Sequence, residues 1–344
     1  MRAVTYQSPG EVRVEEKPDP EVGTPDEAVV RVEATGVCGS DLHLYHGRIQ
    51  IEPGFTLGHE YVGTVVATGD DVTSVSEGDR VLGAFLTACG ECFFCRRGDF
   101  HKCDRGRVFG HGSTLGSLQG AQADLLLVPR ADMTLRRVPE GLSDEVALFA
   151  GDVMGTGYHA VEALDLEPGG SVAVLGLGPV GLCAVQVALA AGAETVLAVD
   201  SVEERLAMAG TFGATPLHLT EDDVRGAVKQ ATEGRGVDGA IDAVGHPQAL
   251  DMACRLARKA GTVSATGVYS TPVELHMGIV WIKSLTLRSG QANVIAHLDP
   301  VLERLASGQL DPAPLVTHHM KLDDAAEAYA IYDRREALKI VLNP

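Results

Sequence analysis

The pattern of apolar and polar positions along the 344-residue chain changes near its middle. In the first part, short apolar or alternating runs such as residues 28–33 and 63–68 end in glycine-rich or acidic turns, and a turn at 78–81 leads into another run. Runs of this length predict strands. Ser143 then stands as an N-cap before a helix at 144–150. We expect a β-rich, barrel-like half.

From residue 171 onward, apolar strands alternate with longer helical segments. Strands are expected at 171–175, 195–199, 215–218, 237–244 and 262–266, with helices at 179–191, 222–231 and 247–257. Ser201 and Glu204 form a capping-box pattern that opens a further helix. This alternation predicts an α/β fold with a parallel, doubly wound sheet. The last part is mixed, with a helix at 300–307, a helix after Asp323 and a strand at 338–342.

The composition excludes several classes of protein. The chain carries 28 Lys and Arg against 47 Asp and Glu, a formal net charge of −19. Such an acidic chain is poorly suited to bind nucleic acid or an anionic membrane. No run approaches the ~18 apolar residues of a membrane helix, and the first residues lack the apolar region of a signal peptide. We expect a cytoplasmic protein of about two domains, without a nucleic-acid or membrane partner.

Four of the seven cysteines follow the pattern Cys89-x2-Cys92-x2-Cys95-x7-Cys103. Clustered cysteines in a cytosolic chain bind metal more often than they form disulfides. Four thiolates at this spacing can close a tetrahedral zinc site on one loop, and an iron–sulfur cluster can also use four cysteines. A closed site leaves no position for substrate, so we expect a structural role.

A glycine-rich loop, GLGPVG at residues 176–181, follows an expected strand and opens an expected helix. Asp200 lies at the end of the next strand, which is the context of a dinucleotide-binding loop. Gly176 permits the tight turn, Gly178 lets the pyrophosphate approach, and Gly181 lets the helix pack closely. The Asp200 carboxylate can accept hydrogen bonds from the adenosine ribose.

A third group of residues is dispersed along the chain. Cys38 lies in the segment CGSDLH, His59 in GHE, and Asp152 at the start of DVMGTGYH. A single histidine or aspartate is more often structural. Together, however, the three offer one thiolate, one imidazole and one carboxylate, which can form a three-ligand zinc site with an open fourth position.

In content and order, these motifs resemble those of zinc-dependent alcohol dehydrogenases of the medium-chain dehydrogenase/reductase superfamily. The resemblance covers essentially the whole chain, including a terminal ALKIVL strand. It implies a β-rich GroES-like (barrel-like) catalytic domain formed by residues 1–152 and 288–344. It also implies a Rossmann NAD-binding domain at 153–287. Asp152 departs from the liver-type members, which use a second cysteine, and is similar to bacterial secondary-alcohol and glutathione-independent formaldehyde dehydrogenases.

The resemblance implies two zinc ions per chain and NAD as the cofactor. It assigns the catalytic zinc to Cys38, His59 and Asp152, and the structural zinc to Cys89, Cys92, Cys95 and Cys103. Ser40 matches the hydroxyl that takes the alcohol's proton, and His43 the imidazole that passes it on. Asp41 matches a carboxylate that orients His59, and Glu60 one near the metal, with Lys339 as its basic partner. Cofactor contacts are implied for Gly176, Gly178, Pro179, Val180, Gly181, Asp200, Arg205, Thr156, Val244 and Gly267.

The implied reaction is reversible hydride transfer between NAD and a small alcohol, such as a secondary alcohol or diol, giving an aldehyde or ketone. The alternative is a glutathione-independent formaldehyde dehydrogenase or dismutase that holds NAD tightly, although those chains are usually longer. A non-enzymatic relative would have lost zinc ligands or the relay, and all of these are present. The family implies a homodimer or homotetramer.

The substrate pocket is expected from residues 48–55, 109–118 and 280–293, whose shape would set the specificity. His111 is expected to be an ordinary loop residue. Cys183 and Cys254 lie within apolar helical stretches and are expected in the core.

Overall fold

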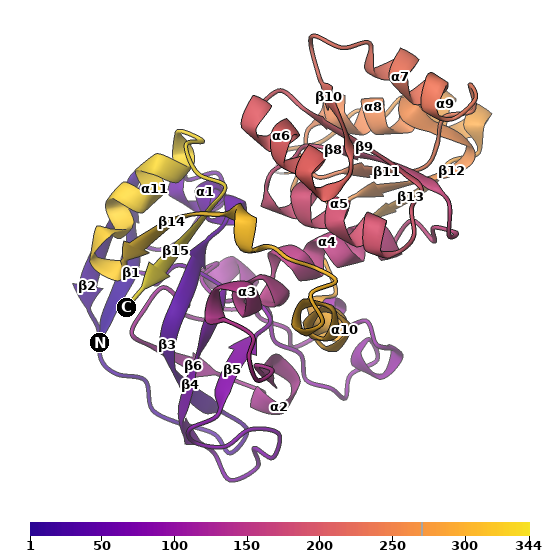
Figure 1. Cartoon of the computed structure of the whole chain (residues 1–344). Helices are drawn as coiled ribbons and strands as arrows, with labels where there is room; N and C mark the ends of the chain where they lie inside the picture. The colour runs from indigo at the N-terminus through magenta and orange to yellow at the C-terminus, as the bar shows by residue number, and fades with distance from the viewer. Residues whose placement is uncertain (270) are drawn as a thin grey trace. The chain divides into compact units, whose positions relative to one another are not determined.

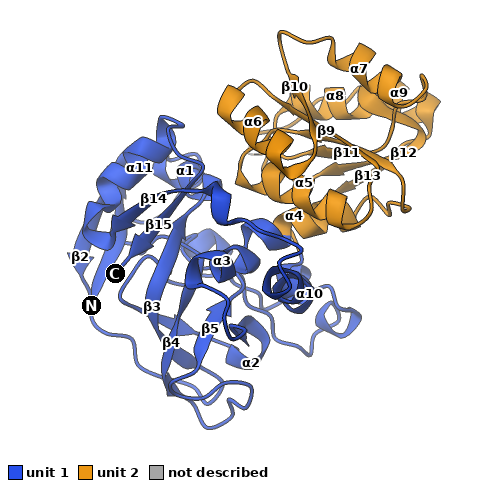
Figure 2. Ribbon diagram, in the orientation of Figure 1, with its two compact units in different colours: residues 1–155, 293–344 blue, residues 156–292 orange. Residues whose placement is uncertain are grey.

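The computed structural model describes residues 1–269 and 271–344, which form two compact units (Figures 1 and 2). Unit 1 consists of Met1–Gly155 and Asn293–Pro344, and unit 2 of Thr156–Ala292. The sequence predicts domain boundaries at 152/153 and 287/288, which lie a few residues before the boundaries between the two units. Unit 1 is therefore built from two separated stretches of chain, whereas unit 2 is continuous.

Unit 1 contains a seven-stranded sheet and a separate two-stranded hairpin. Along the sheet the order is β14 (Val316–Lys321), β15 (Lys339–Asn343), β3 (Ala28–Val37), β4 (Tyr61–Thr68), β5 (Arg80–Gly83) and β7 (Leu135–Arg137), with β6 (Leu125–Val128) also paired to β3. The hairpin is β1 (Arg2–Ser8) and β2 (Glu11–Glu16). Within the described chain this strand order is an open path, so the expected barrel-like sheet does not close.

Short helices join these strands. They are α1 (Gly39–Tyr45), α2 (Ala131–Thr134), α3 (Asp144–Leu148), α10 (Val294–Ala306) and α11 (Ala325–Asp333), and α4 (Val153–Glu162) begins at the end of the first stretch. The predicted cap of α3 is confirmed, because Ser143 Oγ accepts the N–H of Val146 at 3.3 Å. The predicted start of α10 at residue 300 is wrong. Its first turn is anchored by the buried Val294 and Ile295, which outweighs the missing N–H of Pro300 inside the helix.

One core of unit 1 joins the hairpin to both separated stretches of chain. Val37 at the end of β3 and Leu44 of α1 pack with Tyr329 of α11 and Ile340 of β15, and all four are fully buried. The end of β3, where Cys38 follows, is therefore held by the C-terminal segment of the chain.

Unit 2 is a six-stranded parallel sheet in the order β10, β9, β8, β11, β12, β13. The strands are β8 (Ser171–Leu175), β9 (Thr195–Asp200), β10 (Thr215–His218), β11 (Val237–Asp242), β12 (Ala257–Ala265) and β13 (Thr286–Ser289). This is the 3-2-1-4-5-6 order of a Rossmann fold, as the strand–helix alternation predicted. The strand order reverses at β8, which carries the glycine-rich loop at its carboxyl end.

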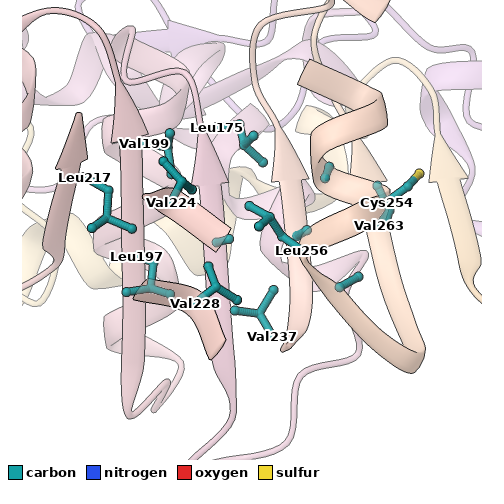
Figure 3. Close-up of a cluster of buried hydrophobic side chains, with 14 of the residues drawn as sticks. Leu175, Leu197, Val199, Leu217, Val224, Val228, Val237, Cys254, Leu256 and Val263 are labelled. Atoms are coloured by element: carbon teal, nitrogen blue, oxygen red, sulfur yellow. The ribbon is translucent and has the colours of Figure 1, made fainter. Parts of the chain in front are cut away.

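The helices of unit 2 are α5 (Pro179–Ala190), α6 (Glu203–Phe212), α7 (Val224–Ala231), α8 (Pro247–Leu256) and α9 (Met277–Lys283). Figure 3 shows side chains of α7 and α8, among them Val228 and Leu256, packed with side chains of the strands. The predicted Ser201 capping box is wrong. The N-cap of α6 is Val202, because the Asp200 carboxylate takes the N–H groups of both Ser201 and Val202.

Among the described residues, no helix combines the length and the apolarity needed to cross a bilayer.

Candidate functional site

Three loops of unit 1 bring Cys38, His59 and Asp152 to one point. Cys38 directly follows β3 and is the N-cap of α1, His59 precedes β4, and Asp152 lies between the 3-10 turn Phe149–Gly151 and α4. Cys38 Sγ and His59 Nε2 each lie 3.2 Å from Asp152 Oδ2. All three side chains are buried. The structure thus places a sulfur, a nitrogen and an oxygen donor from distant segments in direct contact.

The backbone before His59 requires glycine. Gly58 has φ +89°, a left-handed conformation that costs little only without a Cβ, and a Cβ there would also collide with the side chain of Gln122. This turn directs the next residue, His59, inward.

Asp41 faces the other ring nitrogen of His59. Its Oδ1 lies 3.2 Å from His59 Nδ1, and its Oδ2 accepts the N–H of Cys38 at 2.9 Å. A proton on Nδ1 leaves Nε2 free to bind a metal, because a neutral imidazole has one donor and one acceptor nitrogen. Asp41 therefore lies where its carboxylate can orient the imidazole of His59.

The electrostatics of the three groups favour a cation among them. Burial opposes charge on His59, but Asp41 and Asp152 outweigh it and hold the pKa of His59 well above its usual range. Burial also opposes charge on Asp152, yet contact with His59 lowers the pKa of that carboxyl. Burial and Asp152 raise the pKa of the Cys38 thiol to about 11. One sulfur, one nitrogen and one oxygen donor in an acidic setting fit a zinc ion with three protein ligands.

Glu60 is the fourth potential ligand of this group, and it is held by a buried lysine. Its ligand atom lies within 4.8 Å of those of Cys38, His59 and Asp152. Lys339 Nζ lies 2.6 Å from Glu60 Oε1 and 2.7 Å from Oε2. A Cβ on Gly36 would collide with this carboxylate. Lys339 thus stands beside Glu60, where the resemblance placed a basic partner.

Ser40 and His43, the two expected relay residues, lie on α1. Ser40 Oγ is 3.3 Å from His59 Nε2, at the edge of the ligand group. His43 Nδ1 is buried without a hydrogen-bond partner among residues 1–269 and 271–344. Burial, with Arg48 and His46 nearby, lowers the pKa of His43. The structure thus brings Ser40 to the ligands and supplies a neutral imidazole one turn later, with no direct bond between the two in the described chain.

The four-cysteine lobe forms a second donor group. All four sulfur atoms lie within 4.8 Å of one another, Cys89 to Cys95 at 3.9 Å and Cys92 to Cys103 at 3.9 Å. A tetrahedron of sulfurs around one zinc, at about 2.3 Å each, has edges of about 3.8 Å. An iron–sulfur cluster binds its cysteines through different iron atoms and needs wider spacing. The distances therefore fit a single zinc ion better than a cluster.

Backbone N–H groups of the lobe stabilise negative charge on the sulfur atoms of Cys89 and Cys103. Cys103 Sγ accepts the N–H of Cys89 at 3.2 Å, and Cys89 Sγ accepts the N–H of Cys92 at 3.4 Å. Burial opposes ionisation of Cys89, but backbone N–H groups outweigh it and lower its pKa to about 6. Burial raises the pKa of Cys95 to about 12. A thiolate is already favoured at one of the four positions at neutral pH, which is the form that binds metal.

In unit 2 the glycine-rich loop has the geometry that its sequence predicts. Gly176, directly after β8, has φ +87°, and a Cβ on Gly181 would collide with its carbonyl oxygen. A Cβ on Gly178 would meet nothing within 4 Å. Pro179 is the first residue of α5 and Val180 the second, so the helix N-terminus opens directly after Gly178. Open space at a helix N-terminus suits a pyrophosphate.

Asp200 closes this loop from the end of β9. Its Oδ2 accepts the N–H of Leu177 at 2.6 Å, and Arg205 Nη1 lies 3.9 Å from the same oxygen. The carboxylate is thus fixed beside the loop by the backbone N–H of Leu177.

The other expected cofactor residues lie at several places in unit 2. Val244, just beyond β11, is half exposed, and its side chain occupies the space that a Cβ on Gly176 would need. Gly267, beyond β12, packs so closely on Gly245 that a Cβ would collide with it. Thr156 lies on α4, at the start of unit 2. Gly176, Val244 and Gly267 therefore share the carboxyl edge of the sheet, where ligands of open α/β sheets bind.

Sequence reasoning missed three buried residues beside the donor group. His111 lies in a loop as expected, but it is buried, with its ring 5.1 Å from that of His59 and its Nδ1 2.8 Å from the Phe109 carbonyl oxygen. Gln122 and Tyr329 form a hydrogen-bonded pair behind Asp41. A polar residue between Ala121 and Ala123, just before an apolar strand, was the available signal for Gln122. Cys183 and Cys254 are buried in the core, as expected.

Comparison with known proteins agrees with this architecture. Residues 24–140 match the family described as the alcohol dehydrogenase GroES-like domain, and residues 179–307 match the zinc-binding dehydrogenase family. Together the fold and the two matches define a dehydrogenase with a GroES-like domain and a Rossmann domain.

Relatives cover the whole chain. A probable zinc-binding alcohol dehydrogenase of Mycobacterium tuberculosis is 42% identical, over 100% of this chain and 89% of the relative. An uncharacterised zinc-type alcohol dehydrogenase-like protein of Bacillus subtilis is 36% identical over 100% of both. The solved alcohol dehydrogenase of Thermus sp. ATN1 has a TM-score of 0.96 and 44% identity, covering 100% of this chain and 99% of that one. The chain belongs to the zinc-binding alcohol dehydrogenases of the medium-chain dehydrogenase/reductase superfamily.

Proposed function

We propose that this protein is an NAD-dependent zinc alcohol dehydrogenase that interconverts a small alcohol, such as a secondary alcohol or diol, with its ketone or aldehyde. The observation that carries the proposal is the contact of Cys38 and His59 with the same oxygen of Asp152. Burying three polar side chains from three separate loops at one point is costly unless they bind a common partner. In a dehydrogenase of this family they supply a metal site with one position left for substrate.

The residues of the site have the following roles in this proposal. Cys38, His59 and Asp152 hold the zinc ion, which when bound lowers the pKa of an alcohol and stabilises its alkoxide. Ser40, beside His59, accepts the proton of the alcohol. Burial lowers the pKa of His43, which favours its neutral form, and its Nδ1 has no hydrogen-bond partner in the described part of the chain, so this imidazole can receive the proton and pass it on. Cys89, Cys92, Cys95 and Cys103 hold a second, structural zinc.

In unit 2 the loop at Gly178 receives the pyrophosphate of NAD, which supplies the hydride acceptor. Asp200 binds the adenosine ribose. Both cofactors occur among similar solved structures: a zinc-binding dehydrogenase from Sinorhizobium meliloti 1021 (29% identical) is bound to NADP, and a protein described as a short chain alcohol dehydrogenase from E. coli CFT073 (26% identical) is complexed with NADH. The support for NAD comes from Asp200, whose charge opposes a 2′-phosphate, and from the adjacent Glu203 and Glu204, which add to it.

A glutathione-independent formaldehyde dehydrogenase is the second candidate, favoured by the carboxylate ligand Asp152. Such an enzyme from Bacillus subtilis is 30% identical over 100% of this chain and 97% of that relative. The two candidates differ in how tightly they hold the cofactor. Nicotinamide that stays with the protein through purification would favour the second.

The assembly we propose is a homodimer or homotetramer formed through unit 2. In this unit Met277, Trp281 and Ile282 of α9 are 60%, 78% and 66% exposed. The strand β13, which follows α9 in sequence, pairs with β12 and, among the residues that the structure describes, with no other strand, so its other edge is open there. Exposed apolar side chains next to an open strand edge are typical of a protein–protein interface.

A panel of primary alcohols, secondary alcohols, diols and polyols, followed by NADH absorbance, tests the proposed activity. We expect turnover with a subset of secondary alcohols or diols, and none in Asp152→Asn or in zinc-free protein. Equal turnover by Asp152→Asn would contradict the proposal.

A further inference from the structure

Gln122 is a fully buried amide that contacts both loops carrying the proposed ligands. Its Nε2 donates to the Gly36 carbonyl oxygen at 3.0 Å, two residues before Cys38. Its backbone N–H donates to the Leu57 carbonyl oxygen at 2.9 Å, two residues before His59. Its side chain also fills the space beside Gly58. One residue therefore sets the spacing between the Cys38 loop and the His59 loop.

Tyr329 on α11 fixes the orientation of this amide. Its hydroxyl donates to Gln122 Oε1 at 2.9 Å, and the tyrosine is fully buried. With the amide reversed, Oε1 would face the carbonyl oxygen of Gly36 and the carboxylate of Asp41, with no proton between these acceptors. The observed orientation is the one that satisfies every group, so Nε2 is turned towards Asp41.

Asp41 connects this amide to His59. Gln122 Nε2 lies 3.4 Å from Asp41 Oδ2, which also accepts the N–H of Cys38. The opposite oxygen, Oδ1, faces His59 Nδ1 at 3.2 Å, and neither of these two atoms has another hydrogen-bond partner in the described chain. Holding Oδ2 from behind therefore sets the direction in which Oδ1 meets the imidazole.

We propose that Gln122, oriented by Tyr329, is a positioning residue of the catalytic zinc site. Its amide holds Asp41 so that His59 keeps its proton on Nδ1 and presents Nε2 to the metal. The inference rests on the proposed function as a zinc enzyme, and it concerns metal retention rather than substrate or NAD. A purely structural amide would stabilise unit 1 without changing how the zinc is held.

Zinc release from the purified holoenzyme to a chromogenic chelator tests this role. The phase that disappears in Asp152→Asn belongs to the Cys38 site. Gln122→Glu keeps the shape and the acceptor for Tyr329, but its carboxylate repels Asp41. At pH ~8 we expect Gln122→Glu to release zinc from the Cys38 site at least about 10-fold faster than the unmodified enzyme. Changes at residues that orient metal ligands have effects of this size. The ratio to the unmodified enzyme should shrink at lower pH, because a protonated carboxyl can donate as the amide does.

Tyr329→Phe is the second variant, and Tyr332→Phe is its matched control. Both remove one hydroxyl from a buried tyrosine of α11, but only Tyr329 bonds to Gln122. We expect a several-fold faster phase in Tyr329→Phe and an unchanged phase in Tyr332→Phe, even where their unfolding temperatures fall equally.

The possible outcomes distinguish the assignment of the zinc ligands from the positioning role of Gln122. If no zinc phase disappears in Asp152→Asn, the ligand assignment fails, and with it the proposed function. If the phase is present but Gln122→Glu and Tyr329→Phe release zinc at the unmodified rate, only the positioning role is overturned. Equal acceleration by Tyr329→Phe and Tyr332→Phe would also overturn it, because the effect would then reflect loosening of α11.

Discussion

Glu60 and Lys339 form a buried ion pair, 2.6 Å between Oε1 and Nζ, across 279 residues of sequence. Neither side chain reaches solvent. Burial lowers the pKa of Lys339, but Glu60 outweighs it and raises that pKa above its usual range. The pair places a positive charge beside Glu60, the member of the four-residue donor group Cys38, His59, Glu60 and Asp152 that we have not assigned to zinc.

Breaking this pair should destabilise unit 1. Lys339→Met leaves the Glu60 carboxylate buried without its cation, and we expect a loss of about 3–5 kcal/mol in the free energy of unfolding. Adding Glu60→Gln removes the unpaired charge and should recover part of the loss. Denaturant unfolding of the single and double variants measures both effects. A double variant less stable than Lys339→Met would contradict the explanation.

Zinc content tests the ligand set. We expect close to two zinc ions per chain in protein purified without chelator, and close to one in Asp152→Asn. The amide keeps the shape of the carboxylate but removes the charge that balances the metal. Elemental analysis and circular dichroism together measure the count and confirm that the fold is intact. Normal zinc content and activity in this variant would make Glu60 the next candidate for the third ligand.

The four-cysteine lobe should contribute to stability and not to chemistry. Cys89→Ser should remove one zinc ion and lower the stability by at least about 2 kcal/mol, seen as a fall of about 4–8 °C in Tm. Cys254→Ser is the matched control, because Cys254 is buried in unit 2, outside both donor groups, and should leave the zinc count at two. Full stability together with a missing zinc ion in Cys89→Ser would refute the structural role.

Cofactor choice should follow the charge of Asp200. A 2′-phosphate would meet this carboxylate at close range, so we expect NAD to be favoured over NADP by at least about 100-fold in kcat/KM, or about 3 kcal/mol. Asp200→Gly combined with Ser201→Arg should shift the preference towards NADP. Glu203→Gln, which removes a charge without touching the Leu177 N–H, should shift it only slightly. Steady-state kinetics with both cofactors decides, and equal efficiency in the unmodified enzyme would refute this role of Asp200.

The open edge of unit 2 should be an interface between copies. Trp281→Glu places a charge at the most exposed of the large apolar side chains and should lower the association state in analytical ultracentrifugation. Leu219→Glu is the control, since Leu219 follows β10 at the opposite edge of the sheet. A monomer in the unmodified protein, or an unchanged assembly in Trp281→Glu, would count against this surface.

Much of unit 2 could be predicted from sequence, because strands such as β8 and β9 are short apolar runs and their alternation with helices indicates a parallel sheet. The strand β13 was not predicted, because its four residues TLRS are not an apolar run and are all exposed. The predicted strands at 171–175 and 215–218 agree with β8 and β10. Local capping was harder to predict. Ser201 is not the N-cap residue of α6. The Asp200 carboxylate, held by the N–H of Leu177 in the glycine-rich loop, accepts the N–H groups of Ser201 and Val202 instead. That competition depends on a tertiary contact that no spacing in the sequence records.

In unit 1 the sequence indicated which residues to inspect but not how they are supported. Cys38, His59 and Asp152 belong to recognisable motifs, whereas Gln122 and Tyr329 are 207 residues apart and belong to none. Their pairing follows from the packing of α11 behind α1, which is a property of the assembled core. Among the described helices, α10 shows the same limit, since buried apolar contacts override the proline that its sequence places inside it.

The place of β15 between β14 and β3 has a consequence for biosynthesis. Residues 156–292 are all available to fold while the ribosome is still translating, but the sheet of unit 1 lacks an interior strand until residues 339–343 emerge. At about 5–20 residues per second, translation from Asp152 to Lys339 takes roughly 10–40 s. For that interval the nascent chain holds Glu60 without its lysine and its metal-binding thiols in an unfinished domain. Zinc supply and reducing conditions during translation should therefore affect the yield of active protein.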